Sequence, residues 1–286
     1  MKMKRLLTIL LIGIMAFSVS GCGNKNTEED NDKNDDTDKA SYQDGVYHAE
    51  YDRKDARNWI PYVDITIEDN KISKAYYDYT NDAGDIRTND ENYTKNYSDA
   101  NDGMTPREAF DKLGSQLVDK QDIQKVDAVS GATHSSRNFT ELATAALQNA
   151  VKGDTAPAKI KLYDDGVYKV EGDAFDEYGW KPFLELTIKD DQITNVVYDA
   201  KNEAGNLKTA DAEYKKNMEA KTGTYPEKYS KELMQQLLDK QVISQVDTIT
   251  GATQSSDKFT ELVEYALDDM AEVGDTNPAV IKLETK

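Results

Sequence analysis

The sequence of 286 residues is poor in the side chains on which thiol and metal chemistry depend. It contains one Cys and two His. No disulfide can form within the chain, and no Cys-ligated iron–sulfur cluster, His/Cys zinc site or CxxCH haem attachment can be built. Metal sites are therefore not expected, and any redox chemistry has to come from an organic cofactor.

Basic residues are also few. Lys and Arg number 35 against 54 Asp and Glu, a formal charge of −19. A surface this acidic repels phosphate backbones, which excludes nucleic-acid binding through a basic footprint. Hydrophobic residues make up 38% of the chain and include 17 Tyr, enough for packed cores and too many for disorder throughout. The length allows two ordinary domains.

The N-terminus indicates where the protein resides. A short basic region, Lys2 to Arg5, precedes the apolar run Leu6–Val19, which is too short to span a bilayer but typical of a signal peptide. Val19-Ser-Gly-Cys22 then resembles a bacterial lipobox, in which the Cys is diacylated and becomes the mature N-terminus. We expect residues 1–21 to be removed and Cys22 to anchor the chain to the extracellular face of the cell membrane. The alternative is a plain secretory signal with an incidental Cys.

An acidic segment follows the anchor. Residues 23–41 contain no aliphatic side chain larger than Ala, and seven of the nineteen are acidic. Such a segment buries too little apolar surface to offset its ordering entropy. We expect residues 22–41 to form the lipidated Cys and a disordered tether without a specific partner, which holds the folded part off the membrane.

The rest of the chain is one unit written twice. Tyr42–Tyr47 matches Tyr163–Tyr168 at an offset of 121 residues; the offset is 120 from Pro106 through Leu147, and 121 again at Gly153. Two single-residue adjustments over so long a unit indicate internal duplication. The sequence thus predicts two homologous domains, 42–162 and 163–286. A Gly-Asp-Thr tail ends each copy, and we expect it to supply a closing strand.

Within each copy, strand patterns precede helix patterns. Apolar residues recur at period two over 46–51, 62–67 and 71–79, and again over 183–188 and 192–198. Helical spacing follows Pro106 and Pro226, and returns after Thr133 and its counterpart in the second copy. The predicted class is α+β, with two tandem domains that each have a mainly antiparallel sheet and C-terminal helices.

One motif directly precedes the last helix of each copy. It reads Asp127-Ala-Val-Ser-Gly-Ala-Thr-His-Ser-Ser136 in the first copy and Asp247-Thr-Ile-Thr-Gly-Ala-Thr-Gln-Ser-Ser256 in the second. The Gly allows a tight turn, and the Thr and Ser residues then lie at a helix N-terminus, where free N–H groups and the helix dipole favour a phosphate. Simple N-capping is the alternative, although a cap needs only one Ser or Thr.

The motif resembles the flavinylation signature of FMN-binding domains, found in flavin-carrying subunits of the sodium-pumping NADH:quinone reductase and of Rnf complexes. The resemblance implies that a flavin transferase joins FMN through a phosphoester to Thr133 and to Thr253. It also implies that the transferase recognises the residues before each Thr: Asp127, Ser130, Gly131 and Ala132, and Asp247, Thr250, Gly251 and Ala252. With the lipobox and acidic tether, the whole mature chain resembles the flavinylated lipoproteins of Gram-positive extracellular electron transfer.

The chain departs from the respiratory members of that family. It carries neither their membrane helix nor their Gly-rich loop upstream of the motif. Trp59 and Trp180, each followed two residues later by Pro, are candidates to stack on the flavin, although closing the open face of the sheet is the favoured alternative, since aromatic side chains bury well for ordinary reasons. His134 is replaced by Gln254 in the second copy, which argues against a mechanism that needs a histidine beside the attachment site.

These features predict an electron carrier and not an enzyme with its own substrate. Two covalent FMN groups would relay electrons from a membrane quinol-linked donor to extracellular acceptors such as ferric iron. Other functions stay open. The chain could be a solute-binding or signalling lipoprotein without covalent flavin, and its released signal peptide could act as a pheromone. A hydrolase is disfavoured because neither copy offers a Ser-His-Asp or Cys-His set.

Overall fold

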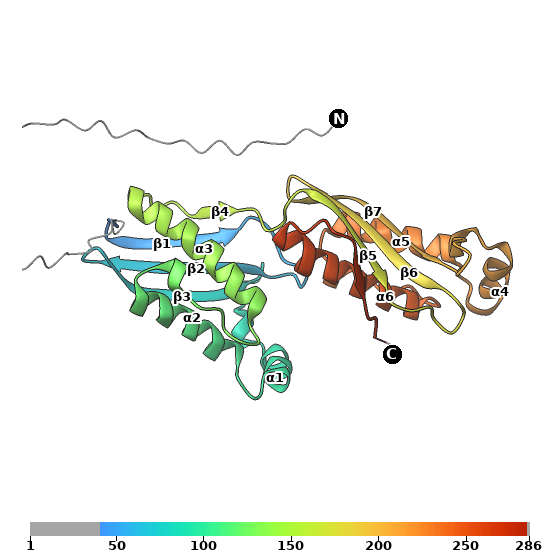
Figure 1. The fold of residues 1–286 in the computed structure, drawn as a ribbon, viewed down its shortest axis with the longest axis horizontal. Helices are drawn as coiled ribbons and strands as arrows, with labels where there is room; N and C mark the ends of the chain where they lie inside the picture. The colour runs from blue at the N-terminus through green and yellow to red at the C-terminus, as the bar shows by residue number, and fades with distance from the viewer. Residues whose placement is uncertain (1–40, 285–286) are drawn as a thin grey trace, which may run out of the picture. The chain divides into compact units, whose positions relative to one another are not determined.

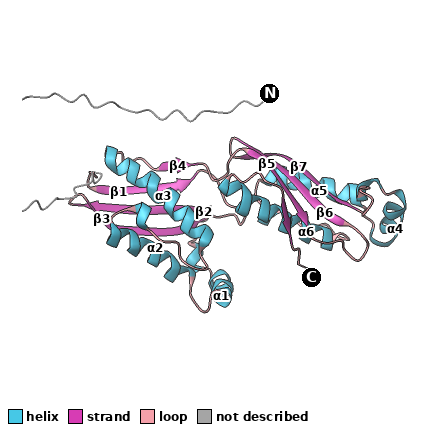
Figure 2. Ribbon diagram, in the orientation of Figure 1, coloured by secondary structure: helices cyan, strands magenta, loops and turns pink. Residues whose placement is uncertain are grey.

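The computed structural model describes residues 41–284. The predicted signal peptide, Cys22 and nearly all of the acidic tether lie outside this range. The described chain contains two four-stranded sheets, each with its own helices (Figures 1 and 2). Among the helices of residues 41–284, none has the length and apolar character needed to cross a bilayer.

The first sheet has the order β3-β2-β1-β4. Strands β1 (Gly45–Tyr51), β2 (Ile60–Glu68) and β3 (Lys71–Thr80) are antiparallel neighbours. Burial alternates along β2, whose inward positions are Pro61, Val63, Ile65 and Ile67, as expected for a sheet with one covered face. Strand β4 (Ala158–Ile160), from the Gly-Asp-Thr tail, pairs in parallel with β1 and so closes the first sheet.

Three helices accompany this sheet: α1 (Glu91–Ala100), α2 (Pro106–Lys120) and α3 (Thr133–Lys152). Helix α2 packs on β3, and α3 packs on β1 and β2. Thr105 and Glu108 form a capping box at the start of α2, with Pro106 at its first position. Short 3₁₀ turns, η1 (Arg87–Asn89) and η2 (Ile123–Lys125), lead into α1 and toward the motif.

The second repeat copies this order. Strands β5 (Gly166–Gly172), β6 (Lys181–Lys189), β7 (Gln192–Lys201) and β8 (Ala279–Ile281) form the sheet β7-β6-β5-β8. Helices α4 (Ala212–Thr222), α5 (Pro226–Lys240) and α6 (Thr253–Tyr265) accompany it, with 3₁₀ turns η3 (Lys208–Ala210) and η4 (Ile243–Gln245). The α+β class with two mainly antiparallel sheets is confirmed, as is the closing strand from each tail.

The repeats differ at the end of the last helix. Helix α3 is regular over 20 residues, whereas α6 gives way to a π-helical turn, η5 (Ala266–Met270), and a 3₁₀ turn, η6 (Ala271–Val273). The sequence offset rises from 120 to 121 across this segment, so the second repeat carries one extra residue there. A π-turn accommodates an extra residue within a helix.

Candidate functional site

The motif forms a loop that ends at the start of the last helix in both repeats. Gly131 has φ of 75°, and a Cβ on it would lie 1.8 Å from the side-chain oxygen of Asn101. Gly251 has φ of 81°, and its Cβ would lie 2.9 Å from the carbonyl oxygen of Thr222. A residue with a side chain is strained in this backbone region, so the loop requires glycine at both positions.

The two threonines open the last helices and are exposed. Thr133 is the first residue of α3, and Thr253 is the first residue of α6. Neither preceding Ala provides a side-chain cap. The N–H groups of the first helical turn are therefore left without a side-chain cap next to each Thr, an arrangement that favours an anion.

The last Ser of each motif holds the loop in place. The Ser136 hydroxyl donates to the carbonyl oxygen of Ala132 at 2.7 Å and accepts the N–H of Val129 at 3.0 Å. Ser256 makes the same two bonds with Ala252 and Ile249, at 3.1 and 3.0 Å. Both hydroxyls are buried. These serines therefore fix the conformation of the loop that leads to each Thr.

The first Asp of each motif is exposed and pairs with the preceding helix. Asp127 contacts Lys120 at 2.6 Å, and its main-chain N–H and carbonyl both bond the side-chain amide of Gln116. Asp247 repeats these contacts with Lys240, at 2.8 Å, and Gln236. The neighbouring Lys lowers the pKa of the Asp127 carboxyl. Ser130 and Thr250 lie exposed between this clamp and the Gly turn, while Ala132 and Ala252 are buried.

A cavity adjoins each threonine. The cavity beside Thr133 has a volume of about 270 Å³, and that beside Thr253 about 550 Å³. Aromatic rings line both: Tyr79, Tyr93 and Tyr97 in the first repeat, Tyr178 and Tyr214 in the second. Ligand sites are typically cavities of a few hundred Å³ with apolar walls and a few polar groups. Each threonine thus lies beside a cavity with the size and lining that are typical of a ligand site.

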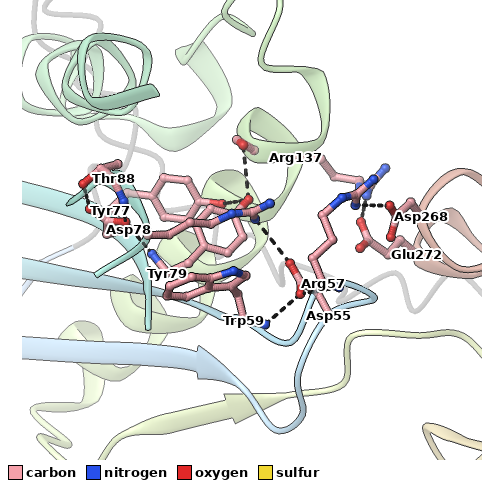
Figure 3. Close-up of polar contacts among 12 residues, drawn as sticks. Asp55, Arg57, Trp59, Tyr77, Asp78, Tyr79, Thr88, Arg137, Asp268 and Glu272 are labelled. Carbon is pink, nitrogen blue, oxygen red and sulfur yellow. Dashed lines mark hydrogen bonds and ion pairs between the residues drawn. The ribbon is translucent and has the colours of Figure 1, made fainter. Parts of the chain in front are cut away.

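The tryptophans do not line these cavities. Trp180 is buried against Tyr214, with ring centroids 5.8 Å apart, and Trp59 packs against the core. The main-chain N–H of Trp59 donates to the carboxylate of Asp55 at 2.8 Å (Figure 3), and the main-chain N–H of Trp180 donates to that of Asp176 at 2.9 Å. Both tryptophans therefore have a core role, which was the alternative to stacking on a flavin.

Basic side chains stand beside the rings in both repeats. In the first, the Arg87 guanidinium lies 4.3 Å from the Tyr93 ring centre and 3.4 Å from the buried carboxylate of Asp55. Burial raises the pKa of Asp55, although Arg87 opposes the shift. In the second, Lys208 replaces Arg87 and lies 4.6 Å from the Tyr214 ring centre. Burial lowers the pKa of Lys208 to about 8.

The acid of the second site has a different environment. Asp176 forms an ion pair with Lys258 at 3.0 Å. Burial opposes ionisation of this carboxyl, but the Trp180 N–H and Lys258 outweigh it, so the pKa of Asp176 is lowered. Position 138 in the first repeat, which corresponds to Lys258, is the neutral Asn138.

The first cavity also receives residues from the second repeat. Both repeats belong to one compact unit of the chain. Asp268, Asp269 and Glu272, from η5 and η6, lie among its lining residues. Arg57 pairs with Asp268 and Arg137 with Glu272, and the Arg side chains point toward these acids (Figure 3). His134 lies 3.5 Å from Asp269.

The residues present fit a phosphate-bearing aromatic cofactor. Exposed threonines at helix N-termini, aromatic walls and basic side chains occur together at both sites. The Tyr97 hydroxyl, in the wall of the first cavity, is buried without a hydrogen-bond partner in the described chain. A bound ligand with polar edges would supply that partner.

Sequence reasoning found the motif but missed most of the wall. Arg57, Arg87 and Lys208 lie far from the motif along the chain and reach it only through folding, whereas Lys258 follows the second motif by two residues. The offset of 121 aligns Arg87 with Lys208, and this shared basic position within otherwise acidic repeats was the available signal. The acids from η5 and η6 had no such signal, because their counterparts in the first repeat are neutral.

Parts of the chain are similar to known proteins. The chain is 43% identical over 98 residues to the 15 kDa lipoprotein of Treponema pallidum, an alignment that covers 34% of this chain and 70% of that protein. A crystal structure of a Clostridium perfringens protein is 36% identical, with a TM-score of 0.41, over 43% of this chain and 99% of its own. A solution structure from Clostridium thermocellum is 28% identical, with a TM-score of 0.28, over 38% and 92%.

A family model matches the chain twice. Residues 61–148 and 178–268 match the model of the FMN-binding domain. Each matched segment contains one motif, one threonine at a helix N-terminus and most of the wall of the adjoining cavity. The chain belongs to the family of FMN-binding domain proteins and carries two such domains in tandem.

Proposed function

We propose that this protein is a membrane-anchored electron carrier in which FMN is joined by a phosphoester to Thr133 and to Thr253. One observation carries the proposal. In both repeats an exposed threonine starts a helix directly after a glycine turn and borders a cavity with aromatic and basic walls. FMN supplies a two-electron centre that passes electrons on singly.

The residues of each site would divide the work of holding the cofactor. The glycine turn brings the main chain close to the phosphate, and the first-turn N–H groups face its charge. The basic side chains, Arg87 in one repeat and Lys208 in the other, add positive charge beside the tyrosine rings. Those rings offer flat apolar faces to a planar ligand. A covalent bond suits a protein outside the cell, where a free cofactor would be lost.

The lipobox and the lipoprotein relative support a location at the membrane, and the partners are proposed from the resemblance to flavinylated electron carriers. The lipobox at Cys22 would carry diacyl chains, and the acidic tether would hold both domains away from the membrane. A flavin transferase would load the threonines. The donor would be a membrane enzyme linked to quinol, and the acceptors would be extracellular oxidants such as ferric iron. The protein would have no substrate of its own and act within a redox chain.

The test is the intact mass of the mature chain made with and without a co-expressed flavin transferase. We expect two added FMN phosphoester masses, located on the peptides that contain Thr133 and Thr253. Thr133→Val and Thr253→Val should each remove one, and the double variant both. Thr155→Val, an exposed threonine outside the motif, is the control and should keep both.

Two results would contradict the proposal. One is no added mass although the same transferase loads a known substrate; this would favour a binding module that takes an anion at the helix N-terminus. The other is retention of both flavins, after denaturation and gel filtration, by the double variant.

A further inference from the structure

The two cavities carry opposite charge. Among the described residues that line the Thr253 cavity, three lysines, Lys208, Lys221 and Lys258, face one acid, Asp176. The Thr133 cavity has two arginines and four acids in its wall: Arg57, Arg87, Asp55, Asp268, Asp269 and Glu272. Arg137 pairs with Glu272 and so offsets one of these acids. The balance is positive beside Thr253 and negative beside Thr133.

The negative balance comes from the second repeat. Its residues Asp268, Asp269 and Glu272 correspond to Gln148, Asn149 and Val151 of the first repeat, which are all uncharged. They occupy the π-helical turn η5 and the 3₁₀ turn η6, the segment that holds the extra residue. π-turns inside helices occur frequently at functional sites.

The three acids are held in different ways. Asp268 is buried and paired with Arg57. Asp269 is about 43% exposed in its side chain and lies 3.5 Å from His134, the residue next to the attachment threonine. Among the described residues Asp269 forms no direct ion pair with an arginine, and it adds a carboxylate beside this site. Burial raises the pKa of Asp269, while His134, Arg137 and Arg57 oppose that shift. In the second repeat the position of His134 is Gln254, and Lys258 lies one turn further along α6.

We infer that the acids of η5 and η6 hold a flavin on Thr133 at a lower reduction potential than the lysines hold a flavin on Thr253. This inference rests on the proposed function. Reduction adds negative charge to the cofactor, so nearby acids disfavour the reduced form and nearby lysines favour it. Electrons then pass in one direction, from the first repeat to the second.

The transfer balances as an exchange of one electron pair. The reduced FMN on Thr133 is oxidised, the oxidised FMN on Thr253 is reduced, and the protons are exchanged with water. No further oxidant or reductant takes part. The membrane donor would refill the first site, and the extracellular acceptor would empty the second.

The experiment measures the midpoint potential of each flavin by spectroelectrochemistry. Flavinylated Thr253→Val carries a flavin only on Thr133, and flavinylated Thr133→Val only on Thr253. We expect the first potential to be lower. One unit charge within about 10 Å, at an effective dielectric constant of about 20, changes the transfer equilibrium about tenfold, which is about 30 mV for a two-electron couple.

Charge variants assign the difference to its source. Asp269→Asn should raise the midpoint potential of the Thr133 flavin, by an amount that corresponds to about a tenfold change in the equilibrium constant for electron transfer. Lys221→Gln should lower that of the Thr253 flavin by a similar factor. Asp239→Asn makes the same charge change on an exposed position of α5 outside both cavities and should alter neither.

The outcomes separate this inference from the proposed function. Absence of the FMN mass in the starting proteins would overturn the function itself. Correct masses with equal potentials, or with the Thr133 flavin higher, would overturn only the direction of transfer. A lower Thr133 potential that Asp269→Asn leaves unchanged would show that the acids of η5 and η6 are not its cause.

Discussion

The two repeats agree in the loop and differ in the wall around it. Ser136 and Ser256 make equivalent hydrogen bonds, Gly131 and Gly251 have similar φ angles, and Asp127 and Asp247 pair with equivalent lysines. By contrast, Arg87 becomes Lys208 and Asn138 becomes Lys258. The loop sets where a cofactor would be attached, and the wall sets its electrostatic environment. Duplication allows the second property to change while the first is retained.

The cores show the same kind of divergence with compensation. Tyr79 in the first repeat corresponds to Ala200 in the second, while Ala109 corresponds to Tyr229. Both tyrosines are buried. In the second repeat, Ala200 and Tyr229 border a small cavity of about 10 Å³ with Ser255. A large side chain thus moved from a strand to a helix, while the buried Phe110 beside Ala109 corresponds to the smaller Ser230, so the exchange compensates only part of the volume.

The largest effect on stability is expected when Tyr79 is replaced by Ala, as in the second repeat, without the matching tyrosine at position 109. Tyr79→Ala removes a buried ring whose hydroxyl bonds Tyr77 at 2.9 Å and Ser135 at 3.1 Å. We expect the free energy of unfolding to fall by about 3–5 kcal/mol, because a cavity opens and Tyr77 loses its acceptor. Chemical denaturation measures the change.

A second substitution tests whether the two repeats solve the same packing problem. Adding Ala109→Tyr to Tyr79→Ala places the tyrosine where the second repeat has it, although Phe110 remains where that repeat has Ser230, and should recover about half of the loss. Ala109→Tyr alone should destabilise, since Ala109 is fully buried and the added ring would overfill the intact core. No recovery in the double variant would mean that the tyrosines of the two repeats fill different spaces.

Sequence alone predicted the frame of each repeat because its signals are local. Period-two burial along β2 and the Pro106 start of α2 are both visible in the chain, and the structure confirms them. Helix α1 was not predicted because none of its residues is buried and its sequence is polar. Its Asp90 cap, which accepts the Tyr93 N–H at 2.8 Å, is the kind of signal that marks such a helix.

The site was only partly predictable for a related reason. The motif is contiguous, so it could be read directly, whereas Arg57 meets Asp268 across 211 residues. Pairing at that separation depends on the placement of η5, which follows from one extra residue in a helix. The extra residue is visible in the sequence as a change of the repeat offset from 120 to 121. The direction that it gives to the side chains of η5 and η6 is visible only in the structure.

The second-largest effect on stability is expected at the glycine turn, which both repeats share. Gly131→Ala and Gly251→Ala both force an alanine into positive φ, and both should reduce flavin loading of their own repeat only. We expect the free energy of unfolding to fall by about 1–3 kcal/mol for Gly131→Ala and by about 2–4 kcal/mol for Gly251→Ala. Gly251→Ala should destabilise more because the new Cβ meets a main-chain oxygen, whereas at position 131 it meets the side chain of Asn101, which can rotate away. Equal losses would show that backbone strain dominates and neighbouring contacts do not matter.

The smallest expected effect is on the pH dependence of stability, which should differ between the two repeats. Lys208 faces Asp176, Asp199 on β7, Lys258 on α6 and the ring of Tyr214 on α4. Its pKa of about 8 in the folded chain lies below that of an unfolded lysine, near 10.5, so the unfolded state binds the extra proton between these values. Stability contributed by this site should therefore rise with pH above about 8.

This rise can be measured on the chain without flavin, by denaturation at pH 7.5 and pH 9.5. We expect Lys208→Met to remove a gain of about 1–2 kcal/mol over that interval. Arg87→Met, at the matching position, should leave the pH slope unchanged because arginine stays charged throughout. A phosphoester on Thr253 would add negative charge to the same cavity and raise the pKa of Lys208, so loading with FMN should suppress the gain. If Lys208→Met and the parent chain keep parallel pH profiles, Lys208 is charged at both pH values. Its positive charge beside Thr253 would then persist over the whole range, which would make the contrast between the two sites independent of pH.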